Sequence, residues 1–512
     1  MKTQVMANEK WPEIMAEKDA RISELEALVA YYEAQLKLSK QKQFGSSSEK
    51  FELPEQLGLF DEAEQTATPK QPEPALEEIT YARRKRMGKR EDDLSGLPIE
   101  VAKYTLPDSE QTCTACGGGL HEMGHNTRRE LTIIPAQVKV IEHKQAVYSC
   151  RHCERHSDHT PIVKAPTPEP VIKGSLASPS AVAHIMHQKY VMCAPLYRQE
   201  QDWQRQGIAL SRQTMANWII RCSADWLEPL YEQMRTRLLA QDVLHADETV
   251  LQVLREPGKK ANTNSYMWMY RTSGDVKHPI VLYEYQPTRS SAHPKRFLDD
   301  FKGYLHTDGY AGYHKLPVTV VGCWAHMRRK FVDALKMVSP QERTDSSALK
   351  AVERIAALFH LESLWKDLPP EERHQRRLAE SKPLAEAFFA WLEALVVLPK
   401  MPLGKAIQYA LSQRSWLMHV YLDGRCEFSN NRAENSLRPF VVGRKNWLFC
   451  NSQKGARASS VIYSIIETAK ENGLKPFEYL NFLLQAVPNA TTGQLEQLLP
   501  WGNAVPDCCR AK

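Results

Sequence analysis

The sequence predicts a multidomain α+β protein in which an α/β core is interrupted by a helical insertion. Three observations support this fold class. The spacing of apolar residues changes from a helical to a strand-like period near residue 241 and becomes helical again after residue 330. Two C-x-x-C pairs precede that core. A length of 512 residues leaves room for roughly three domains.

Composition excludes membrane proteins and secreted disulfide-rich proteins. An apolar content of 42% and a charged content of 25% are ordinary for a globular protein, and no run approaches the roughly 18 apolar residues of a membrane span. The first residues are polar and do not form a signal core. Eleven cysteines, an odd number, argue against a disulfide framework. We therefore expect a cytoplasmic protein with no membrane partner.

Basic residues gather in two places. Residues 81–90 carry six basic groups and no acid, and residues 401–460 carry nine Lys and Arg against three Asp and Glu. The second excess, +6, equals that of the whole chain. Such clusters suit an anionic polymer, although either one alone is also typical of a solvated surface.

The N-terminal residues 1–44 are predicted to form a coiled-coil helix. Apolar residues recur at heptad spacing, which favours association with a second copy of the chain; an amphipathic helix packed on its own protein is the alternative. One series is Met15, Ile22, Val29 and Leu36, and the other contains Leu25 and Tyr32 with interruptions at Lys18 and Ser39. Residues 45–98 are polar and end in the basic run, so we expect a flexible basic linker.

Residues 99–165 are predicted to be a zinc ribbon that binds DNA. Two strands between the C-x-x-C pairs would carry four thiolates in a tetrahedral site, which leaves no open position for catalysis. The expected ligands are Cys113, Cys116, Cys150 and Cys153. The 33 residues between the pairs exceed the usual spacing, so reduced thiols without metal are the alternative. Possible substitute ligands are His121, His152, His156 and His159.

Residues 174–240 are expected to be helical and to contain a helix-turn-helix at 195–221. The first helix ends at Gly207, and Ser211 caps the second. Helix-turn-helix proteins place the start of the second helix in the major groove, whereas any helical hairpin could show the same pattern. The residues expected to contact base edges are Arg212, Gln213 and Asn217.

Residues 241–330 are predicted to be the first part of the core. Five strand-like runs follow one another, and the first and fourth share the pattern Leu-His-x-Asp, ending at Asp247 and Asp308. Acidic residues on the first and fourth of five strands match the arrangement of an RNase H-like sheet. A lone carboxylate in a buried strand is costly, and the strongest reason to keep two is divalent metal for phosphoryl transfer. Alternation along the strand puts His245 on the face of Asp247 and turns Glu248 away.

Residues 331–425 are predicted to be a helical insertion, residues 426–485 the final part of the core, and residues 486–512 a C-terminal tail. The final part contains a third acidic site, Glu434. An ordinary helical role is open for it, because Asn431 and Glu434 have capping-box spacing and Arg438 lies one turn later.

Basic residues near the acidic positions are expected to hold DNA phosphates, although each alone is also typical of a solvated charge. They are Arg328, Arg329, Lys330, Arg438, Arg444 and Lys445.

Several segments together resemble the transposases of the insertion-sequence-66 family. They are FGSSSEK, the C-x-x-C pairs, SRQTMANW, HADET, HTDGYAGY, GCWAHMRRKF and NNRAENSLRPFVVGRKNWLF, with the match reaching LLPWGN near the end. The resemblance implies a DDE triad, carried onto Asp247, Asp308 and Glu434. It implies that these residues hold two Mg²⁺ (or Mn²⁺) ions and that DNA strands are cut and joined by in-line phosphoryl transfer.

The resemblance implies a bacterial DNA transposase that binds the terminal inverted repeats of its own element and then target DNA. We expect double-stranded DNA, a second copy of the chain and accessory proteins of the same element as partners, and association with the nucleoid when DNA is bound. Two alternatives remain: a DNA-binding regulator with an inactive nuclease fold, and an RNase H-like nuclease that cuts without joining.

Overall fold

The computed structural model describes residues 138–150, 162–339 and 341–511, together with Lys18, Arg155 and His159. The predicted coiled coil, apart from Lys18, and the predicted linker lie outside the described residues. The chain divides into two compact units. The smaller comprises Glu52–Thr167 with Lys512, and the larger comprises Met1–Phe51 with Pro168–Ala511.

The described part of the smaller unit contains one short antiparallel strand pair, β1 (Val147–Ser149) with β2 (Ile162–Lys164). This corrects the strand prediction for the cysteine module. Residues 138–146 are not a strand, and β1 pairs with a segment beyond the second C-x-x-C pair. Every residue from 138 to 150 is exposed, so an alternating pattern there has no buried face that would stabilise a longer strand. The other predicted strand lies outside the described residues.

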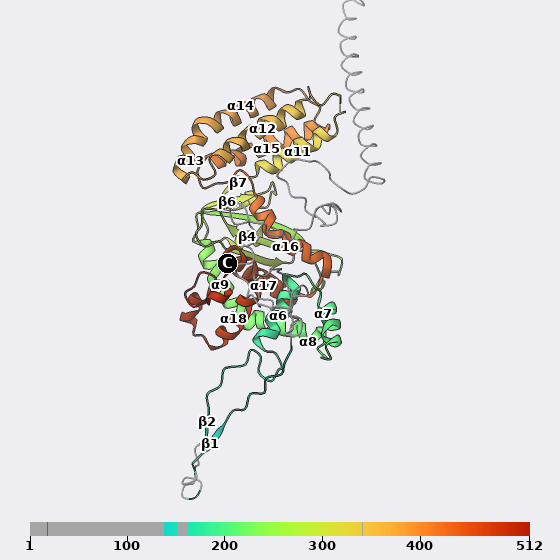
Figure 1. The fold of residues 1–512 in the computed structure, drawn as a ribbon. Helices are drawn as coiled ribbons and strands as arrows, with labels where there is room; N and C mark the ends of the chain where they lie inside the picture. Colours follow the sequence, from blue (N-terminus) through green and yellow to red (C-terminus); the bar gives the residue numbers. More distant parts are fainter. Residues whose placement is uncertain are drawn as a thin grey trace, which may run out of the picture. The chain divides into compact units, whose positions relative to one another are not determined.

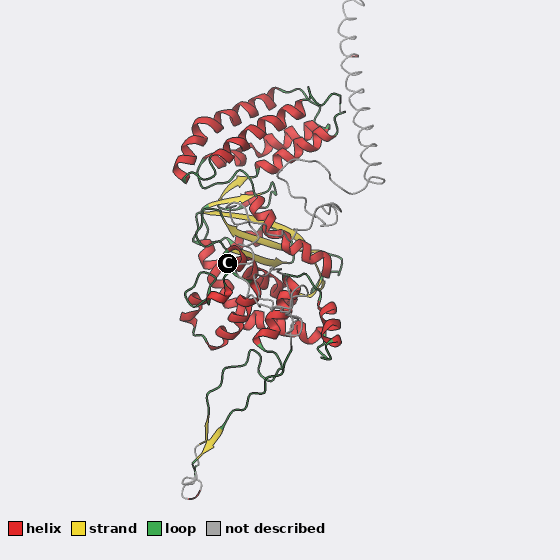
Figure 2. Cartoon of the chain, in the orientation of Figure 1, coloured by secondary structure: helices red, strands yellow, loops and turns green. Residues whose placement is uncertain are grey.

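A six-stranded mixed sheet forms the centre of the larger unit (Figure 2). The order is β5-β4-β3-β6-β7, and β8 pairs with the C-terminal half of β3. β4 pairs antiparallel with β3 and with β5. β6 and β8 each pair parallel with β3, and β7 pairs parallel with β6. The five predicted strands are confirmed. Their bounds are β3 (Val243–Arg255), β4 (Asn264–Thr272), β5 (Val281–Gln286), β6 (Tyr304–Thr307) and β7 (Thr319–Gly322), with β8 (Cys450–Ser452) in addition.

Helices that precede and follow the sheet in sequence bury it in one apolar core (Figure 1). Those before it confirm the predicted helical region, and those after it confirm a helix that carries Glu434. The first group is α6 (Pro179–Tyr190), α7 (Leu196–Arg205), α8 (Arg212–Cys222), the π-helical turn η2 (Ser223–Leu227) and α9 (Glu228–Leu239). The second group is α16 (Asn431–Trp447), α17 (Gln453–Glu471) and α18 (Pro476–Ala486), and a short helix α10 (Ala292–Phe297) follows β5.

Serine side chains cap four helices of the larger unit. Each hydroxyl accepts the backbone N–H three residues later, at 3.1–3.2 Å. This satisfies one donor that the first turn of a helix leaves open. The predicted cap at Ser211 is therefore confirmed. The pairs are Ser178 with Ala181, Ser211 with Thr214, Ser346 with Leu349 and Ser452 with Gly455.

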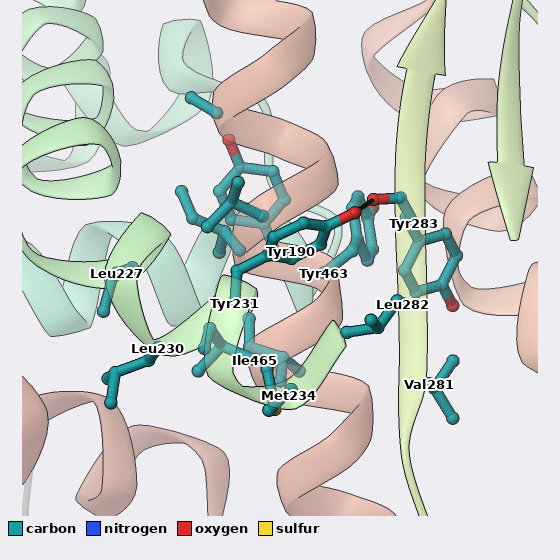
Figure 3. Packing of buried hydrophobic residues seen from close by; sticks show 14 of the residues in the cluster. Tyr190, Leu227, Leu230, Tyr231, Met234, Val281, Leu282, Tyr283, Tyr463 and Ile465 are labelled. Carbon is teal, nitrogen blue, oxygen red and sulfur yellow. Dashed lines mark hydrogen bonds between the residues drawn. The ribbon is translucent and has the colours of Figure 1, made fainter. Parts of the chain in front are cut away.

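Side chains of α17 and α9 cover the outer edge of the sheet at β5. The hydroxyl of Thr468 accepts from the N–H of Val281 (3.0 Å) and donates to its carbonyl (2.9 Å). The hydroxyl of Ser464 accepts from the N–H of Tyr283 (2.8 Å), and the hydroxyl of Tyr231 donates to the Tyr283 carbonyl (3.1 Å; Figure 3). An open edge would invite pairing with another chain; here the outward backbone groups of Val281 and Tyr283 are satisfied inside the fold.

The region predicted as a helical insertion is helical and has an apolar core of its own, but its first helix begins at Trp324 rather than after residue 330. Trp324 is fully buried there and lies against Phe389 and Phe428. The insertion leaves and rejoins the core at one point, because the Trp324 N–H donates to the Phe428 carbonyl (2.9 Å). Its helices are α11 (Trp324–Lys336), α12 (Ser347–Leu364), α13 (Pro370–Arg376), η4 (Arg377–Ser381), α14 (Lys382–Ala394), α15 (Pro402–Met418) and η5 (His419–Tyr421).

The C-terminal residues pack into the main core. Leu495, Leu498 and Val505 are buried, and the hydroxyl of Tyr479 donates to the Leu498 carbonyl (2.8 Å). In the part of the chain that the structure describes, no helix is long and apolar enough to span a membrane.

Candidate active site

The two Leu-His-x-Asp runs lie side by side in the sheet. β3 and β6 are parallel, and their register sets His245 opposite His306. Both side chains are fully buried, and their rings stack with centroids 4.4 Å apart. Two residues further on, the same register brings Asp247 and Asp308 to the same end of the strand pair.

Backbone N–H groups orient both aspartates. The Glu248 N–H donates to Asp247 Oδ1 (2.8 Å). β6 ends at Thr307, and the Tyr310 N–H donates to Asp308 Oδ1 (2.9 Å), which forms a turn at the strand end. The backbone thus fixes the direction of each carboxylate before any ligand binds.

Glu248 is bound by residues outside this pair. Its carboxylate is almost fully buried, accepts from Arg289 Nε (2.8 Å) and Nη2 (2.5 Å), and accepts from the hydroxyl of Tyr313 (2.5 Å). The ion pair and hydrogen bonds occupy both oxygens. Glu248 therefore has a structural partner of its own, in agreement with the alternation along β3.

Asn430 fastens the start of α16 to the strand that carries Asp247. Its Nδ2 donates to the Ala246 carbonyl (2.9 Å), its Oδ1 lies 3.0 Å from His245 Nδ1, and its N–H donates to Cys323 Sγ (3.1 Å). The side chain is fully buried. Glu427, three residues earlier, donates its N–H to His306 Nε2 (3.1 Å).

The capping-box prediction was wrong. α16 begins one residue earlier than that prediction requires, with Asn430 at the cap position and Glu434 beyond the third helical residue. No side chain caps this helix. The physical reason is that the side-chain amide of Asn430 is hydrogen-bonded to His245 and to the Ala246 carbonyl instead of to the helix. Asn431 lies exposed on the first turn.

Glu434 faces α11 of the insertion. Among the described residues its ion pairs are with residues of α11 and not with Arg438, one turn later on α16. Glu434 Oε2 lies 3.5 Å from Arg329 Nη2, and Oε1 lies 3.6 Å from His326 Nε2. Oε1 is buried without a hydrogen-bond partner among the described residues. Burial lowers the pKa of His326, although the negative charge of Glu434 opposes that shift.

The carboxylates influence one another electrostatically. Burial raises the pKa of Asp247 well above its ordinary value, and the charges of Glu248, Asp308 and Glu434 raise it further. Among the described residues, no three His, Cys, Asp or Glu side chains converge into a ready metal cage. The donor set nevertheless fits a hard divalent cation, because it consists of carboxylate oxygens, one of them buried without a partner. Sharing one ion would require these side chains to move toward each other.

The predicted phosphate-binding residues have different surroundings. On α11, Arg329 is exposed and pairs with Glu434, and Lys330 Nζ lies over the Tyr409 ring at 5.6 Å. On α16, Arg444 donates to Thr249 Oγ1 (3.1 Å) and to the Val250 carbonyl, so part of its donor capacity holds β3. The other members of the set are Arg328 and Arg438, both half-buried, and Lys445, which is exposed.

The predicted helix-turn-helix segment forms two packed helices, α7 and α8, with a left-handed Gly207 between them (φ 81°). Met215 and Trp218 are buried beneath α8. Arg212, Gln213 and Asn217 are exposed on its N-terminal half, as expected. Contact with DNA stays a prediction.

Three of the predicted zinc ligands, Cys113, Cys116 and Cys153, lie outside the described residues. Cys150 is described and is exposed. Zinc binding by these four cysteines therefore also stays a prediction.

A cavity of about 620 Å³ lies near the start of β3 and is separate from the carboxylates. Four of its charged residues form two ion pairs, Arg425 with Asp242 (2.5 Å) and Arg237 with Glu496. It offers no set of side chains suited to phosphoryl transfer.

Comparison with known families identifies the chain. The family model described as "Transposase IS66 family" matches residues 174–458, more than half of the sequence. The chain belongs to the IS66 transposase family. Further models match the zinc-finger binding domain of transposase IS66 (residues 110–154), the IS66 C-terminal element (464–501) and "Transposase C of IS166 homeodomain" (31–101). The transposase therefore combines DNA-binding modules with a DDE-type transposase domain.

Relatives from Sinorhizobium fredii (strain NBRC 101917 / NGR234) align over most of the transposase. Uncharacterized protein y4jD is 32% identical over 426 residues, which is 79% of this chain and 81% of the relative. Uncharacterized protein y4hP is 31% identical, with 76% and 73% covered, and uncharacterized protein y4qI is 29% identical, with 92% and 88% covered. These names assign no residue roles.

Sequence reasoning missed the residues that support the candidate site. Asn430 and Glu427 act through partners more than 100 positions away, so no local pattern reveals them. The duplicated Leu-His-x-Asp run was the available signal, because two matching strands in register imply a shared support for their histidines.

Proposed function

We propose that the transposase cuts DNA at the ends of its element and joins them to target DNA, using Asp247, Asp308 and Glu434 in an RNase H-like core. The observation that carries this proposal is the register of β3 and β6, which brings two runs of the same Leu-His-x-Asp pattern to one strand end beside the helix of Glu434. The strand order, three antiparallel strands followed by two parallel ones, supports the RNase H-like assignment.

Asp247, Asp308 and Glu434 would hold Mg²⁺ or Mn²⁺. When bound, two such ions supply activation of the attacking oxygen and stabilisation of the leaving oxygen. The protein's own contribution is positioning. Backbone N–H groups aim Asp247 and Asp308, and Asn430 fixes the position of α16 against β3.

Cations on α11 would place the DNA strand. Arg329 already balances the charge of Glu434 (3.5 Å), and His326 lies on the other oxygen of the same carboxylate (3.6 Å). Phosphate contacts fix the register of a nucleic acid without reading its sequence. Arg328, Arg329 and Lys330 therefore suit the backbone of the strand to be cut.

End recognition would fall to other modules. The exposed Arg212, Gln213 and Asn217 on α8 suit contacts to base edges, and a zinc ribbon held by Cys113, Cys116, Cys150 and Cys153 would add phosphate contacts. Replacing Gln213 with alanine should weaken discrimination between the element's end and unrelated DNA by roughly 1–3 kcal/mol. Competition binding with both DNAs measures this difference.

The central test is strand cleavage with purified protein, Mg²⁺ or Mn²⁺, and a labelled fragment that carries the element's end. Asp247→Asn, Asp308→Asn and Glu434→Gln should each abolish cleavage, because each removes a metal-binding charge, while end-binding stays within a few-fold. Matched controls are Asp299→Asn and Glu353→Gln, which change exposed carboxylates elsewhere and should cleave normally.

Full cleavage by any of the three site variants would remove that residue from the proposed site. Binding without any cleavage by the wild-type protein would favour a regulator. Cleavage without joined products would favour a nuclease.

A further inference from the structure

A strained turn connects the helix of Glu434 to the sheet. α16 ends at Trp447, and Leu448 follows with φ 62° and ψ −50°, a backbone conformation that a leucine rarely adopts. The Phe449 N–H donates to the Trp447 carbonyl (2.8 Å), which closes a three-residue γ-turn. Strain of this kind persists only where neighbouring structure enforces it, and it gathers at sites that contact ligands.

The turn directs two large apolar side chains into solvent. Leu448 is 63% exposed and Phe449 is 42% exposed. Trp447 instead packs edge-on against Phe440, with Lys189 Nζ 5.1 Å from its ring centre. Exposing a leucine and a phenylalanine on a strained backbone contributes nothing to folding. A contact with another molecule would bury these two side chains and explain their exposure.

The charge around the turn favours DNA as that molecule. From residue 435 to residue 466 the chain carries five basic residues and no acidic one. Lys445, Asn446, Asn451 and Lys454 flank the two apolar side chains and are exposed. An apolar tip within a basic and amide rim matches the wedges that DNA-bending proteins insert between base pairs.

The turn is also fixed to both elements of the candidate active site. On one side it continues α16, and on the other it enters β8, whose Cys450 pairs with Val253 of β3. Arg444 ties the last turn of α16 to the same strand through Thr249 and Val250. A wedge built here would keep a constant distance from Asp247 and Glu434.

We propose that Leu448 and Phe449 form a wedge that enters a base step of double-stranded DNA and unstacks it beside the strand to be cut. This inference rests on the proposed function, because Glu434 is taken to mark the cut position. Glu434 and Trp447 are 13 residues apart on one helix, about 20 Å at about 1.5 Å per residue. DNA that follows α16 would be unstacked about six base pairs from the cut, at about 3.4 Å per base pair.

The test uses full-length protein and a series of duplexes from the element's end, each with 2-aminopurine at one position. Divalent metal ions are left out, so the readout does not depend on cleavage. Fluorescence should rise at one or two adjacent positions about six base pairs from the cut. The double variant Leu448→Ser/Phe449→Ser should lose this rise and bind about tenfold more weakly, since a stacked base contributes an affinity of that order.

Two further variants separate the wedge from its surroundings. Leu448→Gly relaxes the backbone and removes the side chain, so it should fold at least as well as the wild type and still lose the fluorescence rise. Leu364→Ser changes a leucine of similar exposure (61%) on the insertion and should keep the rise.

The wedge is overturned if the duplexes bind with no rise at any position, or if the double variant keeps the rise. It is also overturned if the double variant alters self-association in sedimentation while the fluorescence stays unchanged, because the tip would then contact a second copy. A normal rise in a protein that never cleaves with Mg²⁺ supports the wedge and counts against the proposed function.

Discussion

The surroundings of Asp247 in the candidate site disfavour its charged form. It is half-buried, and desolvation together with the charges of three further carboxylates raises its pKa. A raised pKa means that the folded protein holds a proton on Asp247 at pH values where the unfolded chain has lost it. The contribution of Asp247 to stability is therefore present at low pH and is lost as the pH rises toward its folded pKa.

Asp247→Asn should stabilise the metal-free protein near neutral pH, because the amide removes a poorly solvated charge that lies among other carboxylates. We expect a rise in melting temperature of about 2–4 °C, equivalent to roughly 1 kcal/mol in a large domain. The gain should shrink as the pH falls into the ordinary range of Asp. Thermal unfolding at several pH values, with and without Mn²⁺, measures it, and added Mn²⁺ should stabilise the wild type alone. A variant that melts below the wild type at every pH would contradict this account.

Two adjacent asparagines provide a matched test of the support for α16. Asn430→Ala leaves the Ala246 carbonyl and His245 Nδ1 without their partner inside the protein, and should lower the free energy of unfolding by about 2–3 kcal/mol. Asn431→Ala changes an exposed residue with no capping role and should stay within about 0.5 kcal/mol. Urea unfolding followed by tryptophan fluorescence compares them. Equal effects would mean that the buried amide contributes nothing.

These residues also show what a single sequence can predict. Asp247 and Asp308 were recognisable because a repeated pattern in strand-like runs implies one shared site. The sequence indicates a capping role for Asn431, because a cap depends on residues nearby in the chain. It does not reveal the role of Asn430, which bonds to β3 across 184 positions. Arg444 is predicted to contact DNA, yet its guanidinium also donates to Thr249 of β3. That contact depends on where α16 crosses the sheet, which the sequence alone does not indicate.

At the scale of single elements, α16 connects the candidate active site to the strained turn. Its first turn presents Glu434, and its last residue precedes the strained turn at Leu448. Gly443 lets it lie close to α17, because a Cβ there would come 2.5 Å from the Tyr463 hydroxyl. The sequence predicted the helix correctly, whereas the turn conformation depends on the pairing of β8 with β3.

A buried arginine of η4 helps join the insertion to the returning chain, beside Arg373 of α13, which also donates to the Gly424 carbonyl (2.7 Å). Arg377 is 2% exposed, pairs with Glu362 (2.6 Å) and donates to the carbonyls of Asp423 and Gly424 (3.3 Å each). Arg377→Met should cost about 3–5 kcal/mol, because it leaves Glu362 without its counterion in a poorly solvated position.

The control is the preceding residue, Arg376, whose side chain is exposed in its pair with Glu380. Arg376→Met should cost no more than about 1 kcal/mol. Urea unfolding of both variants gives the comparison. A small cost at Arg377 would show that the ion pair is exchangeable for an apolar contact.

At the scale of the whole molecule, the family comparison extends to parts of the chain that lie outside the described residues. The zinc-finger match falls on residues 110–154, most of which lie outside the described residues. From the sequence alone, composition and spacing predict that module, and the predicted strand pattern was partly wrong.

The zinc prediction can be tested by counting metal. Native mass spectrometry should find one zinc ion per chain, and Cys113→Ser or Cys116→Ser should reduce it to none, because each removes a thiolate ligand. Cys508→Ser, which changes an exposed cysteine elsewhere, should keep the ion. Chelation should weaken DNA binding or unfold the module. Normal end-binding by protein without zinc would refute a structural role.

The hydrogen bond between Trp324 and Phe428 has a consequence for how genes of this kind can vary. Because the insertion leaves and returns at one point, residues gained or lost among its helices need not shift the sheet or α16. Between residues 428 and 434, by contrast, a change in chain length would move the start of α16. One codon deleted there would rotate the helix by about 100°, at 3.6 residues per turn, and turn Glu434 away from Asp247. Length polymorphism among active copies should therefore accumulate inside the insertion and stop abruptly at its returning end.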